Sequence, residues 1–122
     1  MKTLGIDYGR SKVGLALGVN DLVEPLKVLH YSDIDDLIGQ IRDIAKEEGV
    51  EKIIVGLSEG EMGEESKRFA KRLGAITFDE TLSSQDAQRI SRESGVPQKR
   101  RREMEDAYAA TLILQNYLDF QA

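Results

Sequence analysis

The sequence contains no cysteine, a single histidine and only two prolines. Without cysteine the chain can form no disulfide, no thiolate metal site and no thiol nucleophile. A histidine-rich metal centre needs several histidines, so we interpret His30 as a structural residue. Any catalysis assigned to this chain must therefore work without a thiol and without a group of imidazoles.

Long hydrophobic runs are also missing. No apolar stretch approaches the about 18 residues of a membrane span, and the N-terminus lacks the basic flank and apolar core of a signal peptide. We therefore expect a cytoplasmic protein with no membrane partner. Its 122 residues, 40% hydrophobic and 32% charged, favour one globular domain over residues 1–122.

The chain has no overall excess of positive charge, since its net charge is −5. This balance argues against a protein that coats nucleic acid along its whole surface. One run of four consecutive basic residues stands out, and it could hold a phosphate backbone at one place. A solvated loop is an equally common explanation of such a run. The run consists of Lys99, Arg100, Arg101 and Arg102.

The most informative stretch is KTLGIDYGRSKVGLALG, residues 2–18. Two apolar runs joined by a short glycine-containing turn predict a β-hairpin. Asp7 follows the first run, and Gly9 and Gly14 have no side chain, so the backbone there can turn sharply or let another segment approach. An acid at a strand end beside a bare turn could hold a metal ion against a phosphate. An ordinary hairpin with an aspartate in its turn is the alternative.

Strands and helices are expected to alternate after this hairpin. Residues 23–30 resemble a third strand, and a helix with one apolar stripe is expected between Ser32 as N-cap and Gly49. The unbroken apolar run in residues 51–57 is typical of a central strand, so strand, helix and strand imply a parallel crossover. Further elements are expected at residues 64–73 (helix), 75–79 (strand), from Ser83 (surface helix) and at 103–120 (helix).

Three carboxylates could meet on this framework. Asp7 ends the first strand, Glu80 follows the last strand, and Asp106 lies early in the final helix. Asp106 shares a helix face with the apolar residues four, seven and eleven positions later, so it should point toward the sheet. Burying a charged carboxylate in an apolar stripe costs free energy unless a polar or charged partner interacts with it. A cation shared with the other two acids would do so.

Such an acid set is the one that metal-dependent phosphodiester cleavage requires. Mg²⁺ and Mn²⁺ prefer oxygen ligands, and two such ions about 3.5–4 Å apart can activate water and stabilise the leaving oxygen. Simpler explanations exist for two of the acids. Asp106 could be an acid favoured by the helix dipole, and Glu80 could be an exposed turn residue.

Several segments, in order along nearly the whole chain, are similar to the YqgF/RuvX family of the ribonuclease H-like superfamily. They are LGIDYGRSKVGLALG, EPLKVLH, IIVGL, DETLSSQDA and EDAYAATLILQNYLD. The resemblance implies an α/β ribonuclease H-like fold. We expect a mixed five-stranded sheet whose first three strands are antiparallel, followed by parallel crossovers, with helices on both faces.

The resemblance also implies a function: a Holliday junction resolvase, or a nuclease that processes the 5′ end of the 16S ribosomal RNA precursor. Asp7, Glu80 and Asp106 would form its acidic site with Mg²⁺ or Mn²⁺, and Asp79 is a possible alternate for Glu80. Structured RNA or branched DNA would be the partner, together with ribosomal precursor particles, and a resolvase would be expected to form a homodimer.

The chain departs from the family pattern near the expected substrate contacts. Lys12 stands where the family often has arginine, which keeps the charge but loses bidentate geometry. Ser58 replaces a proline at the start of a short loop, and Thr81 replaces an arginine that would contact a phosphate or carboxylate. Lys12 and the run of residues 99–102 are the expected contacts to the nucleic-acid backbone.

Two other functions remain open at this point. A non-catalytic RNA- or ribosome-associated module would keep its acids for structure, and the negative net charge and Thr81 favour it slightly. An actin-like phosphate-binding domain also opens with an Asp-x-Gly hairpin. Enzymes of that class need two such domains around a cleft, and 122 residues supply one.

Overall fold

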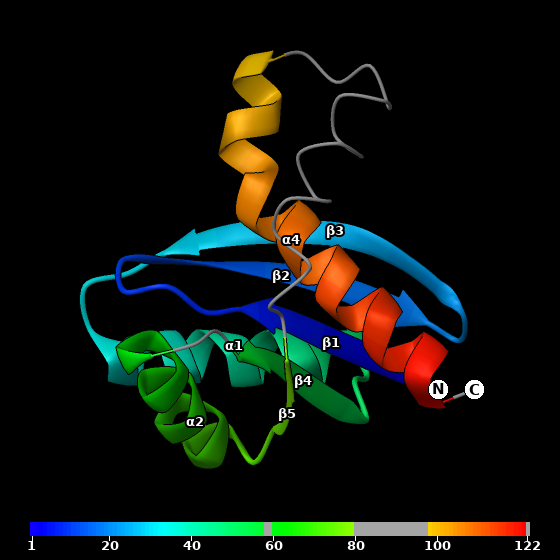
Figure 1. Ribbon diagram of the computed structural model, residues 1–122, viewed down its shortest axis with the longest axis horizontal. Helices are drawn as coiled ribbons and strands as arrows, with labels where there is room; N and C mark the ends of the chain where they lie inside the picture. The colour runs from blue at the N-terminus through cyan, green and yellow to red at the C-terminus, as the bar shows by residue number, and fades with distance from the viewer. Residues whose placement is uncertain (58–59, 80–97, 122) are drawn as a thin grey trace.

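The computed structural model describes residues 1–57, 60–79 and 98–121, with the side chains of 98–103 excepted. Ser58, Glu80, Thr81 and the helix expected from Ser83 lie outside the described residues. The described part forms one five-stranded sheet between helices (Figure 1). The strands are β1 (Lys2–Asp7), β2 (Lys12–Val19), β3 (Leu22–His30), β4 (Lys52–Leu57) and β5 (Ile76–Asp79).

The strand order is β3-β2-β1-β4-β5. β1 pairs antiparallel with β2, and β2 pairs antiparallel with β3. β4 joins the other side of β1 in parallel, and β5 joins β4 in parallel. This confirms the expected mixed sheet, in which the parallel strands end at one edge together with Asp7.

Alternation along β1 and β2 divides their side chains between two apolar cores. One core joins Leu4 and Ile6 of β1 to Leu37 of α1 (Ile34–Glu48) and Phe69 of α2 (Glu61–Leu73). The opposite core packs the sheet against α4 (Gln98–Gln121). Its buried residues are Ala16, Ile54, Ala110, Ile113, Leu114 and Tyr117.

Helix α1 begins one residue later than the capping pattern suggests. Its N-cap is Asp33, whose carboxylate accepts a hydrogen bond of 2.9 Å from the backbone N–H of Asp35. Ser32 and Asp33 both have side chains suited to an N-cap, and the prediction of Ser32 was wrong. The expected end at Gly49 is confirmed, since this glycine adopts φ 71°, a left-handed conformation that favours glycine.

Helix α4 corrects the sequence interpretation more substantially. It begins at Gln98, so residues 99–102 belong to its first turns and do not form a separate segment before the helix. Figure 1 shows this gold N-terminal portion extending beyond the sheet, while the orange and red portion crosses the sheet face. No helix in the described ranges is both long and apolar enough to cross a membrane.

Candidate active site

Asp7 occupies the last position of β1 and lies on the α4 face of the sheet. Two residues earlier on the same strand, Gly5 faces α4: a Cβ built there would lie 2.8 Å from the Cβ of Leu114. Since residues i and i+2 of a strand point to the same side, Asp7 projects toward the α4 side. In the β1–β2 ladder its partner is Gly14.

Gly14 brings Asp106 to the same place. A Cβ at residue 14 would lie 1.9 Å from the backbone oxygen of Asp106 and 2.5 Å from the backbone nitrogen of Ala107. Helix α4 therefore packs its backbone directly on this glycine, and no other residue would fit without displacing the helix. Asp7 and Asp106 thus flank one glycine, one from the paired strand and the other from the helix above it.

The simpler explanation of Asp106, an acid favoured by the helix dipole, can now be compared with its position. Asp106 lies more than two turns beyond Gln98, the first residue of α4, so a stabilising interaction with the helix N-terminus does not account for it. The residues that share its face, Ala110, Ile113 and Tyr117, are buried as expected. Its side chain is 27% exposed, which places the carboxylate at the rim of this buried stripe.

Lys12 completes a charged group on this face. It is the first residue of β2, two positions before Gly14, and therefore projects to the α4 side as well. Its Nζ atom lies 3.2 Å from Oδ2 of Asp106. The site thus contains two carboxylates and one ammonium within a few residues of the Gly14 contact.

Asp79 lies on the other face of the sheet. The residue before it, Phe78, packs against Tyr117 of α4 with ring centroids 5.8 Å apart, so Asp79 projects to the side of α2. β4 lies between β1 and β5, which separates their backbones by about 10 Å. This position does not support Asp79 as an alternate ligand beside Asp7. Glu80, the preferred residue, lies outside the described residues.

The donor chemistry of the described site suits a hard divalent cation. Asp7 and Asp106 offer carboxylate oxygens from two rigid elements, as Mg²⁺ and Mn²⁺ require. Two carboxylates are fewer than a complete protein ligand set, and the described residues hold no group of three potential metal ligands. The third ligand predicted from the sequence, Glu80, is not among the described residues.

The turn that follows Asp7 is held by two contacts that the sequence did not predict. The Tyr31 hydroxyl donates a 2.5 Å hydrogen bond to the Gly9 carbonyl. Arg10 donates from Nε to a carboxylate oxygen of Glu65 in α2 at 2.9 Å. Arg10 lies in the predicted hairpin, but no pattern names Glu65 or Tyr31 as a partner of this turn, because each contact joins segments that are distant in sequence. Both contacts fix the backbone immediately after Asp7.

Replacement of Tyr31 by phenylalanine is expected to lower the free energy of unfolding by about 1 kcal/mol, because the Gly9 carbonyl loses its partner. Burial, then the hydrogen bond with Tyr8, raises the pKa of Tyr31 above its ordinary 10.0. The folded chain therefore holds this proton more tightly than the unfolded chain does. This stabilisation is complete below pH 10.0 and is lost as the pH rises above that value.

Urea unfolding at neutral pH and above pH 10.0 measures both effects. The Tyr31→Phe variant should be less stable at neutral pH, and it should lose less stability than the wild type on going to alkaline pH. Equal unfolding free energies for the two proteins at neutral pH would show that the hydroxyl does not hold the turn.

Known proteins match this chain over nearly its whole length. The family model described as "RuvX: Holliday junction resolvase" matches residues 1–120. A relative from Syntrophus aciditrophicus is 37% identical, with coverage of 98% of this chain and 89% of the relative. One from Chlorobaculum tepidum is 34% identical, with coverage of 97% and 93%. Both carry the name "Putative pre-16S rRNA nuclease".

Solved structures share the fold at low sequence identity. Fowlpox virus resolvase, solved with Holliday junction DNA, has a TM-score of 0.63 and 13% identity, with 99% of each chain covered. T. thermophilus RuvC, solved with a Holliday junction substrate, has a TM-score of 0.56 and 16% identity, with 98% of this chain and 96% of RuvC covered. These likenesses confirm the expected ribonuclease H-like α/β fold. The family match over residues 1–120 and the relatives that are 37% and 34% identical show that the chain belongs to the RuvX family of Holliday junction resolvases, which are nucleases.

Proposed function

We propose that this nuclease is a divalent-metal-dependent endonuclease for structured nucleic acid, with Asp7, Glu80 and Asp106 as its acidic site. The observation that carries the proposal is that Gly14 is both the ladder partner of Asp7 and the packing site of the Asp106 backbone. Two carboxylates on neighbouring rigid elements offer the oxygen ligands that a hard divalent cation prefers. The family match and the names of the relatives favour phosphodiester cleavage as the use of that cation.

Each element has a distinct part in this proposal. Asp7 and Asp106 present carboxylate oxygens from β1 and α4, and Glu80 is proposed as the third acid. A bound Mg²⁺ or Mn²⁺ would supply the activation of a water molecule and the neutralisation of charge on the leaving oxygen. Lys12 lies beside Asp106 and is proposed to contact the phosphate backbone. The Arg10 and Tyr31 contacts hold the turn after Asp7, and we propose that this turn helps to position the Asp7 carboxylate.

The N-terminal part of α4 is proposed to extend the nucleic-acid contact. Residues 99–102 lie on the same helix as Asp106, in the portion that reaches beyond the sheet (Figure 1). A backbone that passes the acidic site could therefore continue along this basic segment. Such a local basic segment would hold nucleic acid despite the net charge of −5.

Replacement of Arg100 and Arg101 by alanine is expected to weaken binding of a four-way DNA junction and to reduce its salt dependence. Each lost phosphate contact lowers the slope of log affinity against log salt by about 1. Fluorescence anisotropy over a series of salt concentrations measures both quantities. Replacement of Lys52, which is exposed at the other end of the sheet, should leave the slope unchanged. An unchanged slope in the Arg100/Arg101 variant would remove this segment from the proposed contact.

Two substrates fit the comparisons, and we propose one active site for either. The names of the relatives give the precursor of 16S ribosomal RNA as the substrate. The description of the family gives the Holliday junction as the substrate. An RNA substrate would imply association with ribosomal precursor particles in the cytoplasm. A junction substrate would imply a dimer, because two strands must be cut symmetrically.

The experiment that tests the proposal compares cleavage of a four-way DNA junction and of a 16S ribosomal RNA precursor, each with Mg²⁺ or Mn²⁺. Wild type and the Asp7→Asn variant are assayed side by side. Cleavage by the wild type that the variant lacks would support the acidic site, and the substrate that is cut would identify the class. Tight binding of RNA by the wild type with no cleavage in either metal would favour a non-catalytic binding module.

A further inference from the structure

We infer that Lys12 is the counter-ion of Asp106 before metal binds, and that its ammonium competes with a divalent cation for this carboxylate. The inference rests on the proposed role of Asp106 as a metal ligand. It assigns Lys12 a second role besides contact with the phosphate backbone. Metal affinity and nucleic-acid binding would then be linked through one side chain.

The first support is the contact itself. Nζ of Lys12 lies 3.2 Å from Oδ2 of Asp106, within the range of a direct ion pair. The Asp106 side chain is 27% exposed and the Lys12 side chain 48% exposed, so the lysine is the more solvent-exposed partner of the pair. A partly enclosed carboxylate paired with a more exposed ammonium is an arrangement in which the ammonium can leave.

The second support is the rigidity of the two backbones. Lys12 is fixed as the first residue of β2 by its ladder position opposite His30. Asp106 is fixed by the contact of its backbone with Gly14, two residues from Lys12. The lysine side chain has more conformational freedom than the short aspartate side chain, because its four-carbon stem has rotatable bonds throughout. The residue that would have to move is therefore the more flexible one of the pair.

The third support is the sign of the charges. An ammonium and a divalent cation on the same carboxylate repel each other, so occupancy by one disfavours the other. A negatively charged phosphate backbone attracts the ammonium away from Asp106 and so favours the cation. By linkage, a cation at the site then favours nucleic-acid binding by the same factor. Lys12 would thereby make metal binding strongest when substrate is present.

The test measures Mn²⁺ affinity of the nucleic-acid-free protein by the electron paramagnetic resonance signal of free Mn²⁺ at low ionic strength. Lys12→Met and Lys12→Gln should each bind Mn²⁺ about 3- to 10-fold more tightly than wild type, because the competing charge is gone. Lys12→Arg keeps the charge and should stay within about 2-fold of wild type. Unchanged or weaker binding in both neutral variants would overturn the inference.

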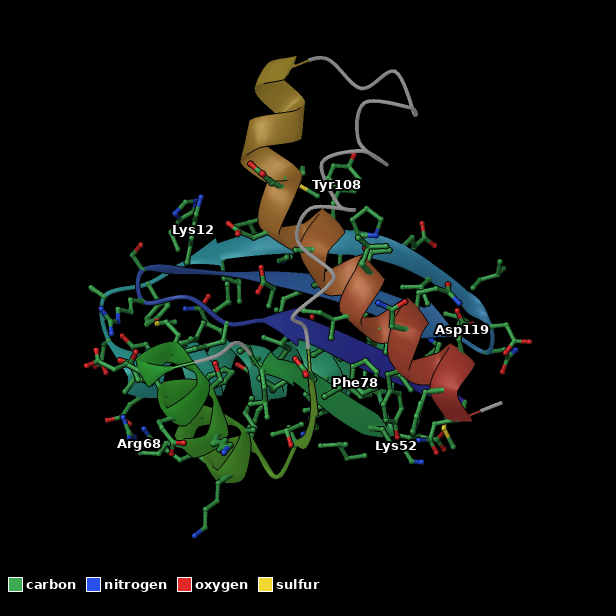
Figure 2. The ribbon with its side chains drawn as sticks, viewed as in Figure 1. Lys12, Lys52, Arg68, Phe78, Tyr108 and Asp119 are labelled. Atoms are coloured by element: carbon green, nitrogen blue, oxygen red, sulfur yellow. The ribbon has the colours of Figure 1, made fainter. Side chains whose placement is uncertain are left out.

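A matched control removes a positive charge far from the site. Lys52 is an exposed lysine at the start of β4, and Figure 2 shows it and Lys12 at opposite ends of the sheet. Lys52→Met should leave Mn²⁺ affinity within about 2-fold of wild type. If it tightens binding as much as Lys12→Met does, net charge and not the Asp106 contact is responsible, and the inference fails. Thermal unfolding in EDTA confirms that each variant is folded.

Failure of the inference and failure of the proposed function can be separated in the same assay. Asp7→Asn and Asp106→Asn should each weaken Mn²⁺ binding if these acids are ligands. Normal Mn²⁺ binding in both aspartate variants would remove the proposed metal site itself. Weakened binding in those variants, with no change in the Lys12 variants, would keep the site and reject only the competition.

Discussion

The Asp7→Asn variant is expected to lose metal-dependent cleavage by at least about 10³-fold, since a metal at the site contributes several kcal/mol of transition-state stabilisation. Asparagine has nearly the shape of aspartate but only one good oxygen donor and no negative charge. Asp7 ends β1 at the edge of the sheet, so the substitution leaves the apolar cores intact. Cleavage rates under single-turnover conditions with Mg²⁺ or Mn²⁺ measure the loss.

The control for this variant is Asp21→Asn. Asp21 is an exposed acid in the turn between β2 and β3, at the opposite end of the hairpin from Asp7. It should cleave at the wild-type rate, and both variants should show the wild-type circular dichroism spectrum and unfolding transition. Wild-type cleavage by a folded Asp7→Asn protein would refute the acidic site, although the fold and the family would be unaffected.

The Gly14→Ala variant is expected to lose both stability and activity. Its new methyl group would be placed 1.9 Å from the Asp106 backbone oxygen and 2.0 Å from its carbonyl carbon. Backbone atoms cannot rotate out of the way as the end of a side chain can, so α4 must move off β2. Overpacking of this kind typically lowers the free energy of unfolding by about 1–3 kcal/mol.

The same displacement moves Asp106 relative to Asp7. A misplacement of about 1 Å at a reacting centre can lower the rate about 10²-fold. Activity should therefore fall even under conditions in which Gly14→Ala is fully folded. Urea unfolding gives the stability, and single-turnover cleavage at low temperature gives the rate of the folded protein.

Gly39→Ala is the matched control for this substitution. Gly39 lies inside α1, and a Cβ built there meets no atom within 4 Å. Alanine in a helix interior is favoured over glycine by about 0.5–1 kcal/mol, so this variant should be slightly more stable than wild type. If Gly14→Ala unfolds with the wild-type free energy and cleaves at the wild-type rate, the close contact of α4 with β2 is not required for the site.

Local patterns in the sequence were sufficient for most of the fold. The two apolar runs around Gly9 became β1 and β2, and the stripe ending at Gly49 became α1. Alternation and helical spacing depend on which side of an element is buried, and that information is carried by neighbouring residues. The position of Asp7 at the end of its strand followed from the same patterns.

The ends of elements were less well predicted, and α4 is the clearest case. Its expected start at residue 103 was wrong, because the basic residues 99–102 offer no apolar spacing yet are good helix formers. The prediction of Ser32 as the N-cap of α1 was wrong for a related reason. The side chains of Ser32 and Asp33 can both accept the same hydrogen bond, and only the backbone path into α1 distinguishes them.

The sequence by itself determined most of the strands and helices, their succession along the chain and the strand-end position of Asp7, because each of these follows from short-range patterns. Gly14 was recognised as a place where another segment could approach, but its partner could not be named. Only the tertiary structure decided that Asp106 packs on Gly14 and pairs with Lys12, and that Tyr31 and Arg10 hold the turn after Asp7. These contacts join residues far apart in the chain, and no local pattern encodes which distant partners packing will bring together.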